Sequence, residues 1–324
     1  MRVANVENLS IGYNQVIVND INFSIRTGEL VSIVGKNGAG KSTLIKTLTG
    51  AIPPISGTVF LHDEPIQKFN PQELAQKVSV VFTNQEVNPM ITVQEVLALG
   101  RSPYKNIFMT INSSDREKIS HTINLLQIAP LVSKRMGELS DGQKQRVMIA
   151  RALIQDTDLI ILDEPTAHLD LSGKFSIFHL LKRLCMIAKK AIVVSTHEID
   201  LALQHSDKMF FIKDNELIDA TPEEIGFNYH LFEHFATSDI KFDYNLGKFV
   251  TNRKGIRQVK LVGSGELKYW VKHALVRNAI DIVDESHIEV HIDGDVLSVH
   301  VNKNHVEYVE DLTTMANYIL SIKG

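Results

Sequence analysis

Residues 35–43 read GKNGAGKST and match the pattern G-x-x-x-x-G-K-[ST] at every fixed position. Residues 30–34 form a short β-branched run that is typical of a buried parallel strand, and residues 41–49 carry apolar side chains at helical spacing. Glycine lets successive backbone N–H groups turn toward anionic oxygens at the positive end of a helix. The stretch therefore predicts a strand, a phosphate-binding loop and a helix, in that order.

The residue types in this loop predict its contacts with a bound nucleotide. Lys41 supplies a point charge for the outer phosphates, Ser42 places its hydroxyl on Mg²⁺, and Thr43 helps to start the helix and reaches a phosphate. A Gly-rich turn that only connects strand and helix is the structural alternative. The loop residues predicted to bind the nucleotide are Gly35, Lys36, Asn37, Gly38, Ala39, Gly40, Lys41, Ser42 and Thr43.

Length and composition predict an ordinary globular protein. The 324 residues are enough for two domains, and the formal charge of −4 gives no strong basic field, so nucleic acid is not expected as the main partner. The single cysteine excludes a disulfide within the chain. No apolar signal core is found at the N-terminus, and no run approaches the ~18 apolar residues of a spanning helix. We therefore expect a cytoplasmic protein that touches a membrane only through another protein.

An apolar stretch that ends in two carboxylates, LIILDE, occupies residues 159–164. Such a strand presents its last side chains at the ligand-binding edge of a parallel sheet. Asp163 suits Mg²⁺, and Glu164 is placed to polarise or deprotonate a water that attacks the γ-phosphate. The alternative is that the two acids begin a solvated loop.

Residues 139–145 read LSDGQKQ and precede a helical apolar pattern. Ser140 and Gly142 therefore lie at a helix N-terminus, where unpaired N–H groups and a partial positive charge can bind a phosphate. Because serine is a good N-cap in any helix, an ordinary cap is the alternative.

Together these motifs resemble the ATP-binding subunit of an ABC transporter over roughly residues 1–225. LSDGQ resembles the family signature LSGGQ, His197 in STHE matches the switch histidine, Asp170 in TAHLD matches the D-loop aspartate, and Tyr13 matches the aromatic residue that stacks on adenine. The resemblance implies an α/β fold of the ABC-type P-loop ATPase, with a mostly parallel core sheet plus antiparallel β and helical subdomains. Its signature residues here are Ser140, Asp141, Gly142 and Gln143.

The resemblance also implies the catalytic roles. Glu164 and His197 are the expected catalytic residues, with His197 forming a hydrogen bond to the γ-phosphate and orienting Glu164 and the water. His168, in the same motif as Asp170, is not expected to be catalytic. One element departs from the family pattern, because Thr83 stands where the Q-loop glutamine is expected. Either Gln85 binds the nucleotide and Mg²⁺ beside Ser42 and Asp163, or Thr83 and Asn84 replace that glutamine.

The resemblance implies partners as well as cofactors. In the family, the signature of one subunit closes over the ATP held by another, so one phosphate loop and one signature predict a homodimer with two composite sites. ATP and Mg²⁺ are the expected cofactors. A many-helix membrane permease, and indirectly a substrate-binding protein, are the other expected partners. The chain is then peripheral to the cytoplasmic face of the membrane.

The cargo is predicted from residues 92–104, TVQEVLALGRSPY. They resemble a pattern of importers for ferric siderophores, haem and cobalamin, and read structurally as an amphipathic helix followed by a Pro-containing turn. Zinc or manganese import stays open. A soluble ABC ATPase that acts on DNA or ribosomes and a small-molecule kinase are the rival classes. Long coiled coils or a second cassette would indicate the former, whereas a kinase needs neither LSDGQ nor a switch histidine.

The C-terminal part carries no family motif. We expect an ATP-binding domain at 1–225, a poorly periodic connection at 226–257, and a small α+β domain at 258–324 that dimerises or regulates the ATPase. Its predicted order is β-α-β-β-α, with a hairpin around Asp293-Gly294 and a final helix over residues 306–322. His287, His291 and His300 alternate with the apolar hairpin residues and are read as a solvated strand face rather than as a metal site.

Overall fold

The computed structural model describes residues 1–83, 87–105, 110–243, 248–251, 255–302 and 305–322. The chain divides into two compact units, Met1–Phe235 and Ala236–Gly324. Each unit has its own buried apolar core. None of the described helices combines the length and the apolar character that crossing a membrane requires.

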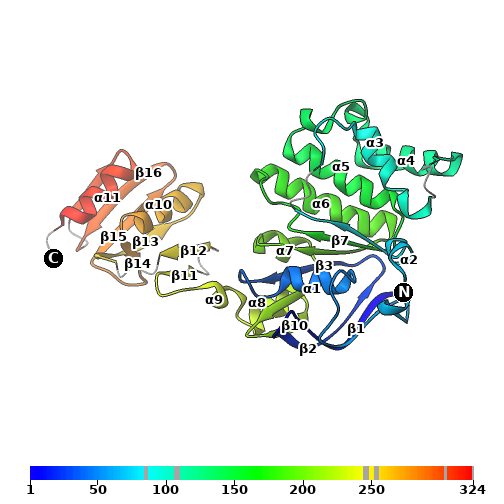
Figure 1. Cartoon of the computed structure of the whole chain (residues 1–324). Coiled ribbons are helices and arrows are strands. Elements are labelled where there is room, and N and C mark those ends of the chain that lie inside the picture. Colours follow the sequence, from blue (N-terminus) through cyan, green and yellow to red (C-terminus); the bar gives the residue numbers. More distant parts are fainter. Residues whose placement is uncertain (84–86, 106–109, 244–247, 252–254, 303–304, 323–324) are drawn as a thin grey trace. The chain divides into compact units, whose positions relative to one another are not determined.

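The first unit is built on a sheet of six described strands, five of which run parallel (Figure 1). Apolar side chains, mostly β-branched or leucine and in β9 also methionine and phenylalanine, fill the parallel strands almost without interruption, as expected when both faces of a parallel sheet are covered. Only β10 pairs in the antiparallel sense, with β9. In spatial order the strands are β10 (Glu216–Ala220), β9 (Lys208–Lys213), β3 (Leu30–Gly35), β8 (Ala191–Ser195), β7 (Leu159–Asp163) and β6 (Val78–Val81).

One face of this sheet is covered by helix α1 (Lys41–Leu48) and by a second, antiparallel sheet. Leu44 and Ile45 of α1 are fully buried in a cluster that contains residues of both sheets. The antiparallel sheet therefore fixes the helix that follows the phosphate loop. Its strands, in spatial order, are β2 (Val16–Arg26), β1 (Arg2–Gly12), β4 (Ser56–Leu61) and β5 (Glu64–Pro65).

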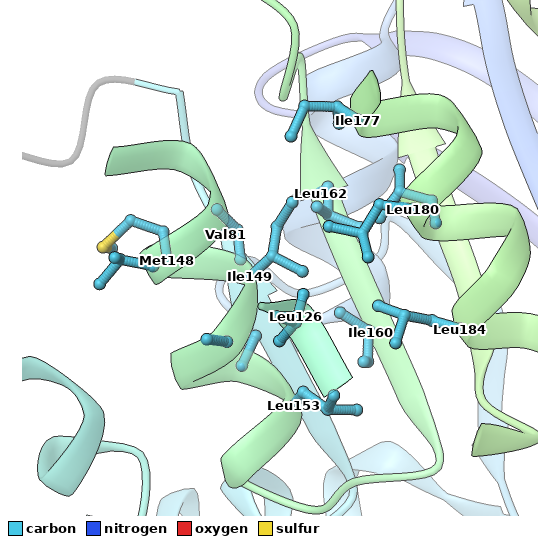
Figure 2. Close-up of a cluster of buried hydrophobic side chains, with 14 of the residues drawn as sticks. Val81, Leu126, Met148, Ile149, Leu153, Ile160, Leu162, Ile177, Leu180 and Leu184 are labelled. Carbon is cyan, nitrogen blue, oxygen red and sulfur yellow. The ribbon is translucent and has the colours of Figure 1, made fainter. Parts of the chain in front are cut away.

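The other face of the central sheet is covered by a helical layer. Figure 2 shows Ile160 and Leu162 of β7 meeting Ile149 of one helix and Leu180 of another. The neighbouring residues Leu159 and Ile161 point into the opposite core, as the two-residue period of a strand requires. The helices are α3 (Val93–Leu99), α4 (Ser113–Leu126), α5 (Asp141–Ile154) and α6 (Leu171–Ala188).

Shorter helices complete the first unit. They are α2 (Pro71–Ala75), α7 (Ile199–His205), α8 (Pro222–Asn228), α9 (Leu231–Phe235) and four 3₁₀ turns at Ile66–Lys68, Ser102–Tyr104, Ala129–Leu131 and Met136–Glu138. Ile225 of α8 and Leu231 of α9 are fully buried against β9. Both helices therefore belong to the core of the first unit.

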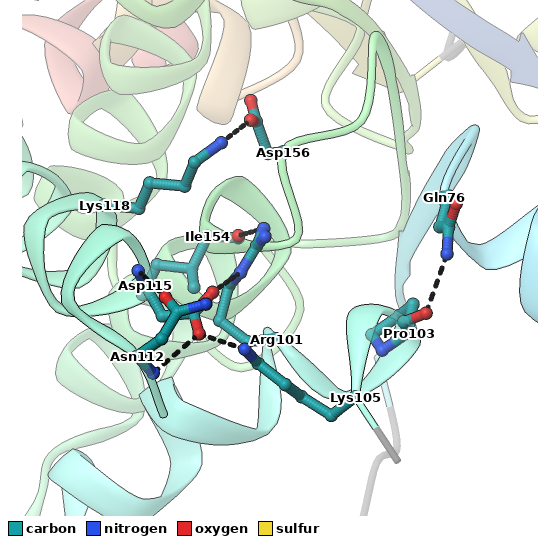
Figure 3. A network of polar contacts seen from close by, with 9 residues as sticks. All are labelled: Gln76, Arg101, Pro103, Lys105, Asn112, Asp115, Lys118, Ile154 and Asp156. Atoms are coloured by element: carbon teal, nitrogen blue, oxygen red, sulfur yellow. Dashed lines mark hydrogen bonds and ion pairs between the residues drawn. The ribbon is translucent and has the colours of Figure 1, made fainter. Parts of the chain in front are cut away.

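The segment GRSPY, which was linked above to lineage, forms a buried polar network (Figure 3). Arg101 donates to Asp115 Oδ1 at 2.8 Å and to the Ile154 carbonyl at 3.0 Å, and Lys105 forms a second ion pair with Asp115. Burial alone would raise the pKa of Asp115, but hydrogen bonds from Lys105, the Asn112 backbone N–H and Arg101 lower that pKa from 3.8 to about 2. The network thus joins α4 to the end of α5.

The second unit contains a small α/β layer. Helices α10 (Glu266–Arg277) and α11 (Leu312–Ser321) bury their apolar sides on the same face of a sheet. A separate hairpin, β11 (Ile240–Asp243) and β12 (Lys248–Thr251), precedes this layer. The sheet strands, in spatial order, are β14 (Ile280–Ile282), β13 (Arg257–Gly263), β15 (Ile288–Asp293), β16 (Val296–Val301) and β17 (His305–Val309).

The structure confirms the predicted α/β fold with its mostly parallel core sheet, and it corrects two expectations near the C-terminus. The expected final helix over residues 306–322 is wrong in its first part, because β17 occupies that region and α11 begins only at Leu312. Asp311 caps α11 by accepting from the N–H groups of Thr313 and Thr314 at 2.7 and 2.8 Å. The β-branched and aromatic residues before this cap favour a strand.

The second correction concerns the expected connection at 226–257. This segment contains α9, of 5 residues, and the two strands of the β11–β12 hairpin, of 4 residues each. Elements this short present too few side chains for a period to be read from the sequence. The strand β14, of three residues, was missed for the same reason.

The network in Figure 3 predicts a stability effect. Asp115→Asn leaves two buried cations without their carboxylate and is expected to lower the free energy of unfolding by about 3 kcal/mol, measured by chemical denaturation. Since the folded pKa of Asp115 is depressed, its contribution is present above pH 3.8 and is lost as the pH falls toward 2.

Lys118→Ala is the matched control for this prediction. Lys118 pairs with Asp156, but the two side chains are 40% and 43% exposed, so the loss should stay below about 1 kcal/mol. If Asp115→Asn and Lys118→Ala lower the free energy of unfolding equally, burial of the Asp115 network does not contribute to stability.

Candidate functional site

The phosphate loop lies between β3 and α1, as the sequence predicts. Gly40 is the N-cap of α1 with φ 110°, and a Cβ there would lie 3.0 Å from Ile17 and 3.2 Å from Val18 of β2. Gly38 also has a positive φ, 80°. Larger residues at these positions would be strained, so the glycines are what allows the loop to close over the helix end.

Lys41 is held on the inner side of this loop. Its ammonium donates to the carbonyls of Gly35 and Lys36 at 2.9 and 3.2 Å, and the residue is 6% exposed. Burial lowers the pKa of Lys41, and the nearby carboxylates of Glu164 and Asp163 act against that shift. The positive charge of the loop therefore lies in the field of the two acids at the end of β7.

Asp163 is held from three sides at the carboxyl edge of the sheet. Its Oδ1 accepts from the hydroxyls of Ser195 at 2.6 Å and Ser42 at 3.4 Å, and its carbonyl accepts from the Thr83 hydroxyl. Strand register explains the first contact, since Asp163 and Ser195 lie opposite each other in β7 and β8. A pocket of about 350 Å³ opens at this edge and is lined by Ser42, Phe82, Thr83, Asp163 and Glu164.

Glu164 leaves the strand with φ 48°. Its N–H donates to both the carbonyl and the hydroxyl of Ser195, at 3.1 and 2.9 Å. Its Oε1 lies 2.8 Å from His197 Nε2, and the two side chains are 34% and 41% exposed. The structure therefore brings together the expected catalytic pair at the mouth of the pocket.

The oxygen donors at this edge fit Mg²⁺. A serine hydroxyl and a carboxylate, with a second carboxylate alongside, are the hard ligands that this ion prefers. Within the described residues, no three His, Cys, Asp or Glu side chains form a metal-binding group. Gln85 and Asn84 lie outside the described residues, whereas Thr83 lines the pocket.

The signature residues lie at the start of α5. Ser140 is its N-cap, accepting from the Gln143 N–H at 3.4 Å while Gln143 Oε1 accepts from the Ser140 N–H at 3.1 Å. Asp141 forms an exposed pair with Lys144. No hydrogen bond or ion pair between described residues connects residues 140–143 with the phosphate loop or the acidic edge. Within one chain the signature therefore stands apart from that site.

Two further predicted residues flank the site. Asp170 caps α6 by accepting from the Gly173 N–H at 2.7 Å, and His168 before it has φ 65°. Tyr13 is 60% exposed, with its hydroxyl 3.4 Å from Lys46 Nζ of α1. An aromatic ring exposed beside the phosphate-loop helix is free to stack on a flat ligand.

Ser195 is the residue that sequence reasoning missed. It is fully buried and contacts both Asp163 and Glu164. The one available signal was a hydroxyl at the last position of an otherwise apolar strand. That signal acquires its meaning only when the register of β7 and β8 is known.

Known proteins resemble this chain over both sequence and fold. The family model described as ABC transporter matches residues 18–167. An uncharacterized ABC transporter ATP-binding protein of Methanocaldococcus jannaschii is 37% identical over 287 residues, covering 86% of this chain and 97% of that protein. That span is longer than the first unit, so it includes part of the second.

A relative with a named role is the iron(3+)-hydroxamate import ATP-binding protein FhuC of Bacillus subtilis, 35% identical over 67% of this chain and 81% of that protein. Other relatives are named as a probable siderophore transport system ATP-binding protein of Bacillus subtilis and as petrobactin and cobalamin import ATP-binding proteins of Bacillus anthracis and Halobacterium salinarum. A solved dimeric ATP-binding cassette, in a post-hydrolysis state with ADP and Pi, has a TM-score of 0.58 and 27% identity over 68% of this chain and 98% of that chain.

The phosphate loop, the two acids, the histidine and the signature occur together in this chain, and a relative named as an ABC transporter ATP-binding protein is 37% identical over 86% of it. The chain belongs to the ABC transporter family as an ATP-binding subunit and is an ATPase.

Proposed function

We propose that this ATPase drives uptake of an iron chelate, such as a siderophore or haem, or of cobalamin, through a separate membrane permease. The names of its relatives support this cargo class, and the TVQEVLALGRSPY segment supports the same lineage. The observation that carries the motor role is the meeting of Lys41, Asp163, Glu164 and His197 at one edge of the sheet.

The geometry supports a division of labour among these residues. The phosphate loop and Lys41 hold the outer phosphates, while Mg²⁺, bound by Ser42 and Asp163, would neutralise their charge. Glu164 orients a water and accepts its proton as the oxygen attacks the γ-phosphate. His197, whose Nε2 lies 2.8 Å from Glu164 Oε1, orients that carboxylate and would donate to the γ-phosphate of bound ATP. ATP hydrolysis would then take place where the ends of β7 and β8 meet the N-terminus of α1.

The isolated position of the signature supports a homodimer. Ser140 and Gly142 lie at the N-terminus of α5, and no hydrogen bond or ion pair among the described residues joins them to the phosphate loop of the same chain. In a two-fold pair, each signature covers the ATP of the partner, so ATP stabilises the closed pair and its hydrolysis favours opening. Such opening and closing is what a permease would convert into transport.

The first prediction tests the hydrolytic role. Glu164→Gln removes the proton acceptor and is expected to lower kcat by about 10²- to 10⁴-fold while leaving the Kd for ATP nearly unchanged, measured by phosphate release and by nucleotide titration. Glu216→Gln, an exposed change on β10, serves as the control. A Glu164→Gln enzyme that keeps most of its rate would remove Glu164 from the mechanism.

The second prediction tests the composite site. Lys41→Ala chains and Ser140→Arg chains, each nearly inactive alone, should regain about a quarter of the wild-type activity when mixed in equal amounts, because about half of the pairs are mixed and one of the two sites in each mixed pair is complete. Mixing Lys41→Ala with a Lys41→Ala, Ser140→Arg double variant is the control, since no complete site can form. Mixtures no more active than their components would contradict the homodimer.

The third prediction tests the cargo. Membrane vesicles that contain this chain with its permease should take up radiolabelled ferric hydroxamate or cobalamin in an ATP-dependent manner, and Glu164→Gln should abolish uptake without dissociating the complex. Uptake of zinc or manganese alone would favour the alternative importer class. Absence of any co-purifying membrane subunit would favour a soluble ABC ATPase.

A further inference from the structure

Ser195 holds the two acids of the site together. Its hydroxyl donates to Asp163 Oδ1 at 2.6 Å and accepts from the Glu164 N–H at 2.9 Å, and the residue is fully buried at the end of β8. We propose that Ser195 is a positioning residue of the ATPase reaction, which sets the rotation of the Asp163 carboxylate and the direction in which Glu164 leaves the sheet. This inference rests on the roles proposed above for those two acids.

The chemistry of the contact requires a hydroxyl. A serine oxygen carries one hydrogen and two lone pairs, so it can donate to a carboxylate and accept from an N–H at the same time. Because Asp163 Oδ1 takes the hydrogen, the lone pairs are left for Glu164. Alanine can make neither contact, whereas threonine keeps both functions and adds only a methyl group.

The hydrogen bond from Ser195 matters for Asp163 because the other contacts of Asp163 either act on a different atom or are weak. Thr83 donates to the Asp163 carbonyl and therefore holds the backbone, not the carboxylate. Ser42 contacts Oδ1 at 3.4 Å, a weak interaction at that distance. Ser195 is thus the strongest described contact that fixes the carboxylate, and its loss would let the proposed Mg²⁺ ligand rotate.

The contact matters for Glu164 because of its backbone. A φ of 48° is unfavourable for a residue with a Cβ and persists only when the surroundings hold it. The Glu164 N–H is shared between the carbonyl and the hydroxyl of Ser195, so one residue supplies both acceptors. Without the hydroxyl this turn loosens, and the carboxylate that faces the attacking water becomes less well directed.

The test compares Ser195→Ala with Ser195→Thr. Ser195→Ala should lower kcat about 10- to 100-fold, as expected for slight misplacement of reacting groups, and should raise the Mg²⁺ concentration that gives half-maximal ATPase activity. KM for ATP should change much less, because the phosphate loop is untouched. Ser195→Thr should recover most of the rate and the Mg²⁺ response.

Ser79→Ala is the matched control. Ser79 is 1% exposed on β6 and accepts a 3.0 Å hydrogen bond from Thr157, so the variant loses one buried hydroxyl contact in the same sheet but away from its carboxyl edge. It should keep the wild-type rate and Mg²⁺ response, and melting curves of all variants check that each is folded. Equal rate losses in Ser79→Ala and Ser195→Ala, or a wild-type Ser195→Ala enzyme, overturn the proposal.

A double variant separates this inference from the proposed function. In the Glu164→Gln background, Ser195→Ala should reduce kcat little further but should still raise the Mg²⁺ concentration needed for ATP binding, since that effect acts through Asp163. Full activity of Glu164→Gln contradicts the proposed catalytic roles themselves. An inactive Glu164→Gln enzyme beside a fully active Ser195→Ala enzyme contradicts the role of Ser195 alone. If Ser195→Ala does not fold, Ser195→Cys takes its place; its thiol is only a weak donor and acceptor, so the same losses are expected in the same direction but smaller.

Discussion

The register between β7 and β8 is the constraint on which the site depends. Asp163 lies opposite Ser195, and Ser195 also lies opposite Ile33 of β3, so the three strands deliver their following loops to one edge. A shift of one residue would turn Asp163 toward the opposite core and separate it from Ser195. Burial of both faces of these strands opposes such a shift, because it would exchange the residues of the two apolar clusters.

The sequence predicted the parts of the site that are local in the chain. The phosphate loop, the two acids and His197 each lie at or just after the end of a strand, and the signature begins a helix, so a short window contains both the element and its functional residues. The role of Ser195 was not predicted because its partners, Glu164 and Asp163, are 31 and 32 residues away in the sequence. Only the pairing of the strands brings them into contact. Arg101 was read as a mark of lineage for the same reason, since its partners Asp115 and Ile154 lie in two other helices.

The second unit was less predictable because it lacks motifs and its elements are short. For the hairpin histidines, the structure shows contacts that the sequence does not reveal. His291 and His300 stack with ring centroids 4.0 Å apart on the sheet face opposite the helices, and His291 contacts Glu289 at 2.7 Å. Glu289 is also paired with Lys260. These contacts hold the two histidines among polar side chains of the strand face.

The buried apolar residues of β7 determine the direction in which the Glu164 side chain leaves the strand. A residue in this conformation costs on the order of 1 kcal/mol, yet it turns the side chain away from the line of β7 and toward His197. The conformation persists because Ile161 and Leu162 are anchored in opposite cores and cannot follow the turn; Figure 2 shows Leu162 in the core beneath the helices. The rigid strand β7 therefore ends abruptly, so that Asp163 at its last position and Glu164 beyond it keep one orientation with respect to the phosphate loop. A site assembled from flexible loops would lose this alignment.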